Sequence, residues 1–192
     1  GDAAAVLGWD QQTYMPPGGA GARAEQLGAL TTIHHEMATG LDAARLLEAA
    51  EAQASGLDSD SDDAAYLRVA RRDFDLAIKL PAELLSEIAR TTTLAHEQWS
   101  QARAENDFAR FAPWLEKNLE LTRKVADHLG YASGEMYDAL LDQYEQGMKT
   151  ADVRAMFNAI RPSLVALVKA VEAQGPEYVT DEVLHRAYDI EA

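Results

Sequence analysis

Two of the five histidines in this 192-residue sequence are followed by glutamate, in the pairs His35-Glu36 and His96-Glu97. A zinc peptidase helix carries His-Glu-x-x-His, so that two imidazoles face one ion and the glutamate activates the metal-bound water. Thr39 stands where the first pair would need its second histidine, and Ser100 stands there for the other pair. We therefore predict that neither pair holds a metal ion.

Other catalytic patterns are equally incomplete in this sequence. A di-iron carboxylate bundle needs two Glu-x-x-His elements, and the sequence offers one, at residues 182–185. There is no cysteine, which excludes disulfides and thiol nucleophiles. Neither a Gly-x-Ser-x-Gly elbow nor a phosphate-binding glycine loop occurs. We predict no catalytic residue and no metal ligand in this chain.

The charge of the chain is strongly negative. It has 32 acidic and 17 basic residues, a formal net charge of -15. Such a surface repels phosphate backbones and anionic lipids, and no apolar run approaches the roughly 18 residues that span a bilayer. We expect a cytoplasmic protein that binds neither nucleic acid nor membranes.

Apolar residues recur at spacings of three and four along most of the chain, the pattern of amphipathic helices. Glycine and proline mark the breaks between them. Helices are expected to end at Gly40, near Gly56, at Leu80, at Gly130 and at Gly175-Pro176. A short helix is expected around residues 136–143, and residues 58–63 read as a loop that caps the following helix.

These helices need partners, because an isolated amphipathic helix is marginal in water. We predict an all-α, antiparallel bundle of about six or seven helices. Residues 1–192 would form one helical region with a weakly defined tail at 177–192. Thr150 is expected to cap the last long helix and Pro162 to kink it. The predicted buried residues are Phe74, Ile88, Trp99, Leu119, Phe157 and Leu164.

Several strings in the sequence are too specific for any general helix rule. Residues 7–19 read LGWDQQTYMPPGG, and residues 137–148 read YDALLDQYEQGM. With residues 23–27, 30–37 and 99–113, they make residues 6 to about 171 resemble the N-terminal half of the carboxypeptidase Taq family. Gln146 is a departure, since that family favours proline there.

The resemblance implies part of a larger all-helical metallopeptidase that removes single residues from peptide C-termini. It also implies zinc or another divalent metal in the full-length parent, a groove between helical halves, and frequently a homodimer. The zinc helix and the third ligand would lie downstream of Ala192. The residues expected to border the groove are Trp9, Asp10, Thr13, Tyr137 and Asp138.

Two alternatives remain open at this point. Asp10 and Asp138 are also suited to capping helices or tying loops, as aspartate often does. The chain as a whole is either an N-terminal segment that forms a wall or lid of a peptidase groove, or a stand-alone helical binding or regulatory protein without catalysis. Reading the gene beyond Ala192 would distinguish the two.

Overall fold

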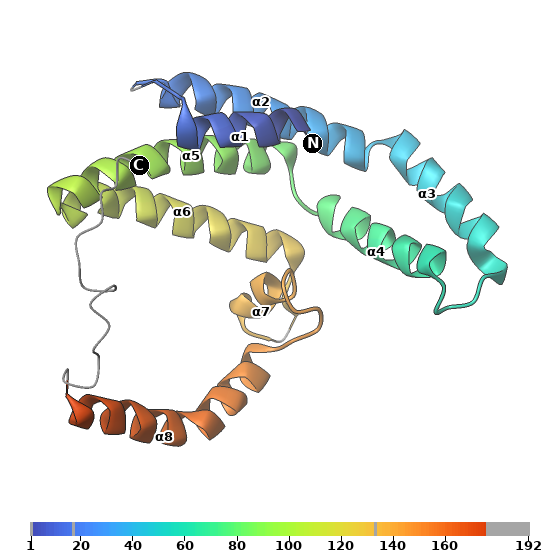
Figure 1. Ribbon diagram of the computed structural model, residues 1–192. Coiled ribbons are helices and arrows are strands. Elements are labelled where there is room, and N and C mark those ends of the chain that lie inside the picture. Colours follow the sequence, from blue (N-terminus) through green and yellow to red (C-terminus); the bar gives the residue numbers. More distant parts are fainter. Residues whose placement is uncertain (1, 17, 133, 176–192) are drawn as a thin grey trace.

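The computed structural model describes residues 2–16, 18–132 and 134–175, and these residues form helices without any strand. The all-α prediction is confirmed. The helices, shown in Figure 1, are α1 (Asp2–Thr13), α2 (Ala20–Thr39), α3 (Leu41–Gln53), α4 (Asp62–Ala77), α5 (Ala82–Glu105), α6 (Phe108–Leu129), α7 (Met136–Leu141) and α8 (Thr150–Gln174), with a 3₁₀ turn, η1 (Ala54–Gly56). Helix α1, which contains the first motif, is a helix that the apolar pattern did not predict.

Helices α2 and α5 lie antiparallel and very close together. Ser86 Oγ on α5 donates to the carbonyl of Gly28 on α2 at 3.2 Å, and a Cβ at Gly28 would lie 3.0 Å from Arg90 Nε. Small residues are buried on both helices, among them Ala20, Ala24 and Gly28 on α2 and Ser86 and Thr93 on α5. The two backbones approach because small side chains separate them.

Two further helix pairs are antiparallel, α5 with α6 and α3 with α4. Helix α6 packs on α5, where Leu121 is buried beside Leu85 and Ile88 and Lys117 pairs with Glu87 at 2.8 Å. Helices α3 and α4 form a hairpin that extends from this layer (Figure 1), joined by the two-bond contact of Arg71 with Glu51.

Predicted helix ends agree well with the structure where local chemistry sets them. Ser61 caps α4 by accepting from the N–H of Ala64, and Asp107 caps α6 by accepting from that of Arg110. Gly130 follows α6 at a φ of 83°, and Gly175 follows α8 at 72°, a region that favours glycine. The prediction that Thr150 caps the last long helix is wrong. Thr150 begins α8, but its hydroxyl donates to Asp138 instead of capping its own helix.

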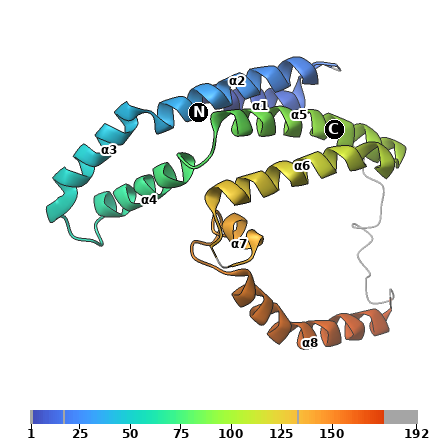
Figure 2. The same ribbon diagram turned by 180° about the vertical axis from the view of Figure 1, so that it is seen from behind.

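Helix α8 stands apart from the α2–α5–α6 layer, and both views show it bending along its length (Figures 1 and 2). Pro162 lies inside it, as the kink prediction requires. Its apolar stripe is open, with Phe157 56% and Leu164 54% exposed. Residues 176–192, including the expected tail and Glu182–His185, lie outside the described residues.

The predicted buried set is wrong. Trp99 is 40% exposed and Leu119 is 47% exposed, and the two predicted residues of α8 are exposed as well. Phe74 and Ile88 are half-buried. The apolar stripes were identified correctly, but many of their large side chains are exposed in the part of the chain that the structure describes. None of the helices in those residues is both long and apolar enough for a bilayer span.

Candidate functional site

The first motif is held in place by Arg23 of α2. Its guanidinium binds the Asp10 carboxylate and the backbone carbonyl of Leu7, both on α1, and its Nε donates to Gln26 at 3.1 Å. Arg23 is only 8% exposed. A buried guanidinium needs such partners, because an uncompensated charge is costly away from water. Asp10 therefore ties α1 to α2.

Trp9 and Thr13 occupy a more exposed side of α1. Thr13 Oγ1 donates to the Trp9 carbonyl at 2.9 Å within the same helix. Trp9 is 57% exposed, and its ring lies 5.4 Å from that of Tyr14. Of the three residues predicted from this motif, Trp9 is the one that presents a large apolar surface to an incoming molecule.

A polar cavity of about 440 Å³ lies between the end of α1, the following loop and α5. Gln11 and Gln12 line it from the motif, and His96, Glu97 and Ser100 line it from α5. In the sequence these residues belong to separate segments. Their sequence separation hides the juxtaposition, which follows from the antiparallel packing of α5 against α2 and the turn back to α1.

In the second motif, Asp138 ties α7 to the start of α8. Its Oδ1 accepts from the Thr150 N–H at 2.7 Å and from the Thr150 hydroxyl at 2.6 Å. Both bonds lower the pKa of Asp138, and the bond from the hydroxyl has the larger effect. A Cβ at residue 134 would lie 2.3 Å from Asp138 Oδ2, so this close approach requires Gly134. Asp138 is 5% exposed and performs the loop-tying role.

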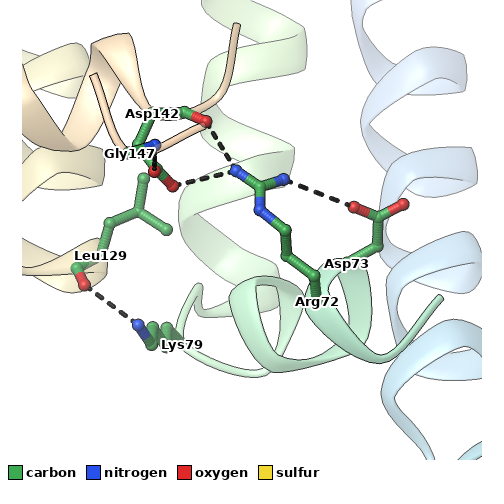
Figure 3. A network of polar contacts seen from close by, with 6 residues as sticks. All are labelled: Arg72, Asp73, Lys79, Leu129, Asp142 and Gly147. Carbon is green, nitrogen blue, oxygen red and sulfur yellow. Dashed lines mark hydrogen bonds and ion pairs between the residues drawn. The ribbon is translucent and has the colours of Figure 1, made fainter. Parts of the chain in front are cut away.

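Asp142, which the sequence analysis did not single out, is a second anchor in the same motif. Its Oδ1 accepts from the Gly147 N–H at 2.8 Å, and this bond is the main cause that lowers its pKa. Arg72 of α4 donates to Asp142 Oδ2 at 2.9 Å, and Lys79 donates to the Leu129 carbonyl at 3.2 Å (Figure 3). The sequence signal that could have identified Asp142 is its position four residues after Asp138, which puts both carboxylates on the same side of a short helix.

Tyr137 faces a different hollow from its neighbour Asp138. It lines an apolar cavity of about 550 Å³ between α5, α6 and α7, together with Ile88, Leu121 and Leu140. Asp138 instead lines a small cavity of about 120 Å³ with Lys79, Leu129 and Lys149. Adjacent residues on a helix diverge by about 100°, so these two do not form one binding surface.

The structure does not bring the two motifs together. Helix α1 lies on α2, and α7 lies beyond α6 on the other side of the layer (Figures 1 and 2). The five predicted residues therefore divide into Trp9, Asp10 and Thr13 at one place and Tyr137 and Asp138 at another.

The described residues do not fit a metal centre. Among them, no three His, Asp or Glu side chains are grouped so that they could hold an ion. His96 of α5 lies near the start of α2, across the cavity from Gly18, whereas His35 lies near the end of α2. Thr39 Oγ1 donates to the His35 carbonyl at 2.7 Å, a hydrogen bond within α2.

Comparison with known proteins gives the context of these motifs. Residues 1–192 match the family model described as carboxypeptidase Taq (M32) metallopeptidase. The chain belongs to the carboxypeptidase Taq family. It is 36% identical over 176 residues to thermostable carboxypeptidase 1 of Pyrococcus furiosus, covering 91% of this chain and 34% of that protein. It is 32% identical over 196 residues to thermostable carboxypeptidase 1 of Thermus thermophilus, covering 98% of this chain and 38% of that protein.

The fold agrees with solved members of the carboxypeptidase Taq family. A crystal structure named BsuCP superposes with a TM-score of 0.81 at 27% identity, covering 90% of this chain and 34% of that chain. Trypanosoma cruzi metallocarboxypeptidase 1 gives a TM-score of 0.69 at 30% identity, covering 97% of this chain and 36% of that chain. The chain thus spans about a third of the length of the relatives it matches.

Proposed function

We propose that this chain is the N-terminal segment of a metal-dependent carboxypeptidase that releases single C-terminal residues from peptides. The observation that carries the proposal is the family match over residues 1–192, combined with relatives named carboxypeptidases of which the chain covers about a third. In this proposal the chain forms a wall or lid of the substrate groove. Trp9, Thr13 and Tyr137 border that groove, while Asp10 and Asp138 hold the helices that carry them.

The divalent metal, zinc or another, would be bound by the remainder of the parent protein. The same proposal includes a cytoplasmic, homo-oligomeric enzyme that acts on peptides. The excess of acidic residues supports the absence of nucleic-acid partners. It also suits a surface that attracts cationic peptide segments.

Sequencing the native gene past the codon of Ala192 tests the proposal. We expect an open frame that encodes a further helical region with His-Glu-x-x-His and a later glutamate, because peptide hydrolysis at neutral pH needs an activated water. A native stop codon soon after Ala192, with no zinc motif in a partner subunit, would favour the stand-alone binding protein instead.

A further inference from the structure

The polar cavity beside the first motif contains a carboxylate without a cationic partner. Two other glutamates of the same layer are paired, Glu25 with Arg90 at 3.0 Å and Glu87 with Lys117 at 2.8 Å. Among the described residues, no Lys, Arg or His nitrogen lies within 4.0 Å of the Glu97 carboxylate. Its one side-chain hydrogen bond there comes from Gln101 at 3.4 Å, a long contact that leaves acceptor capacity unused.

The cavity that Glu97 lines has both neutral polar groups and the apolar Met15 and Pro16 in its walls. Gln11 and Gln12 face it from the motif and Ser100 from α5, and within the part of the chain described, neither glutamine side chain makes a hydrogen bond to protein. Their amide oxygens can accept hydrogen bonds from a ligand beside the carboxylate. Gln101 differs, since Arg110 already occupies its oxygen.

We propose that this cavity binds the cationic side chain of an arginine or lysine residue of a peptide, with Glu97 as the counter-ion and Gln11 and Gln12 as accessory acceptors. The volume of about 440 Å³ is sufficient for a guanidinium-bearing side chain. The net charge of -15 raises the local concentration of such ligands. The inference rests on the proposed function for the peptide nature of the ligand.

Isothermal titration of this chain with two end-blocked tripeptides tests the proposal. One carries a central arginine and the other the neutral isostere citrulline, and the blocked C-terminus prevents either from being hydrolysed. We expect the arginine peptide to bind and the citrulline peptide to bind at least about tenfold more weakly, as a charge-assisted hydrogen bond implies.

Glu97→Gln should weaken binding of the arginine peptide about tenfold. Glu36→Gln is the matched control, because it removes an equal exposed charge at the far end of α2 and should change affinity less than about twofold. Equal losses in both variants, equal binding of both peptides, or no binding to the wild-type chain would overturn the proposal. Gln12→Glu adds a second carboxylate at the exposed rim and should strengthen binding, which keeps the test decisive if Glu97→Gln does not fold.

Hydrolysis is not measured in any of these titrations. A missing metal motif downstream would therefore defeat the proposed peptidase function without affecting the cation site. Absent or charge-independent binding would defeat the cation site and leave the peptidase proposal intact.

Discussion

Arg72 of α4 donates from one nitrogen to two oxygens of Asp142, the carboxylate at 2.9 Å and the backbone carbonyl at 2.6 Å (Figure 3). The two residues are 70 positions apart. Asp142 in turn accepts from the Gly147 N–H, so the loop after α7 is fixed at both of its ends. The YDALLD string is thus a structural anchor between the α3–α4 hairpin and α8.

Arg72→Met should lower the free energy of unfolding by about 1–3 kcal/mol, because it leaves the partly buried Asp142 oxygens without their donor. Arg45→Met is the control, since Arg45 lies 3.9 Å from Asp42 on an exposed helix face and should cost at most about 0.5 kcal/mol. Urea unfolding followed by circular dichroism gives both values. Equal effects would show that the Arg72 contact contributes nothing specific.

Asp138→Asn should lower the melting temperature at neutral pH and lose that effect in acid. The bonds from Thr150 lower the pKa of Asp138 below 3.8, so the folded state favours its ionised form. That stabilisation is complete above the unfolded-state pKa and disappears as pH falls through the lower folded-state pKa. Thermal melts of wild type and variant should therefore differ at about pH 7 and converge as the pH falls through the folded-state pKa of Asp138.

Asp152→Asn separates the hydrogen bonds from the general effect of a negative charge near the start of α8. Asp152 lies in the first turn of the same helix, where a charge interacts with the helix dipole. Two results would contradict the role assigned to Thr150. The melting temperatures of wild type and Asp138→Asn could differ by the same amount over the whole acid range, or Asp152→Asn could produce the same pH-dependent difference.

Helix positions were predictable from the sequence because their signals are local. Ser61 and Gly130 each bond to backbone groups within four residues, and these helix ends lie where the sequence predicts them. The short spacing of apolar residues likewise identified the stripes. Periodicity states which residues share a face, and this was enough to predict an all-α fold.

Burial and the site were not predictable by the same means. Leu119 and Phe157 lie on genuine apolar stripes, but their exposure depends on which other segment covers that face. The bond from Arg72 to Asp142 and the shared cavity of Gln11 with Glu97 join residues far apart in the chain. No single-helix pattern contains that information. The family strings indicated important places without stating what each residue contacts.

The first motif makes separate predictions for Trp9 and Asp10. Asp10→Asn should destabilise this chain by about 1–3 kcal/mol, since it removes the charge partner of the buried Arg23. Trp9→Ala should change stability by less than about 0.5 kcal/mol, because Trp9 is mostly exposed. In the full-length parent, Trp9→Ala should raise KM for peptides at unchanged melting temperature. Unchanged KM would remove Trp9 from the groove.

The open stripe of α8 should cause this chain to self-associate. Phe157, Ile160, Leu164 and Val168 are each 48–56% exposed, and apolar patches of this kind promote association. Leu164→Asp should raise the dissociation constant about tenfold or more, since a buried leucine contributes about 1.5–3 kcal/mol. Asn158→Asp, off the stripe on the same helix, adds the same charge and should have little effect. Sedimentation at high concentration measures both, and a monomeric wild type would contradict the prediction.

The isolated chain should neither retain zinc after dialysis nor hydrolyse peptides. A tight zinc site needs three or four well-placed ligands, and each His-Glu pair supplies one histidine. His35 lies near the end of α2, and His96, on α5, lies near the start of α2. Metal analysis of the dialysed protein and a carboxypeptidase assay with added zinc check the two parts of the prediction. His35→Ala and His96→Ala are the informative variants. Stoichiometric zinc that either substitution abolishes would show that the histidine belongs to a site completed by residues outside those described, and the metal centre would then have to be assigned to this chain.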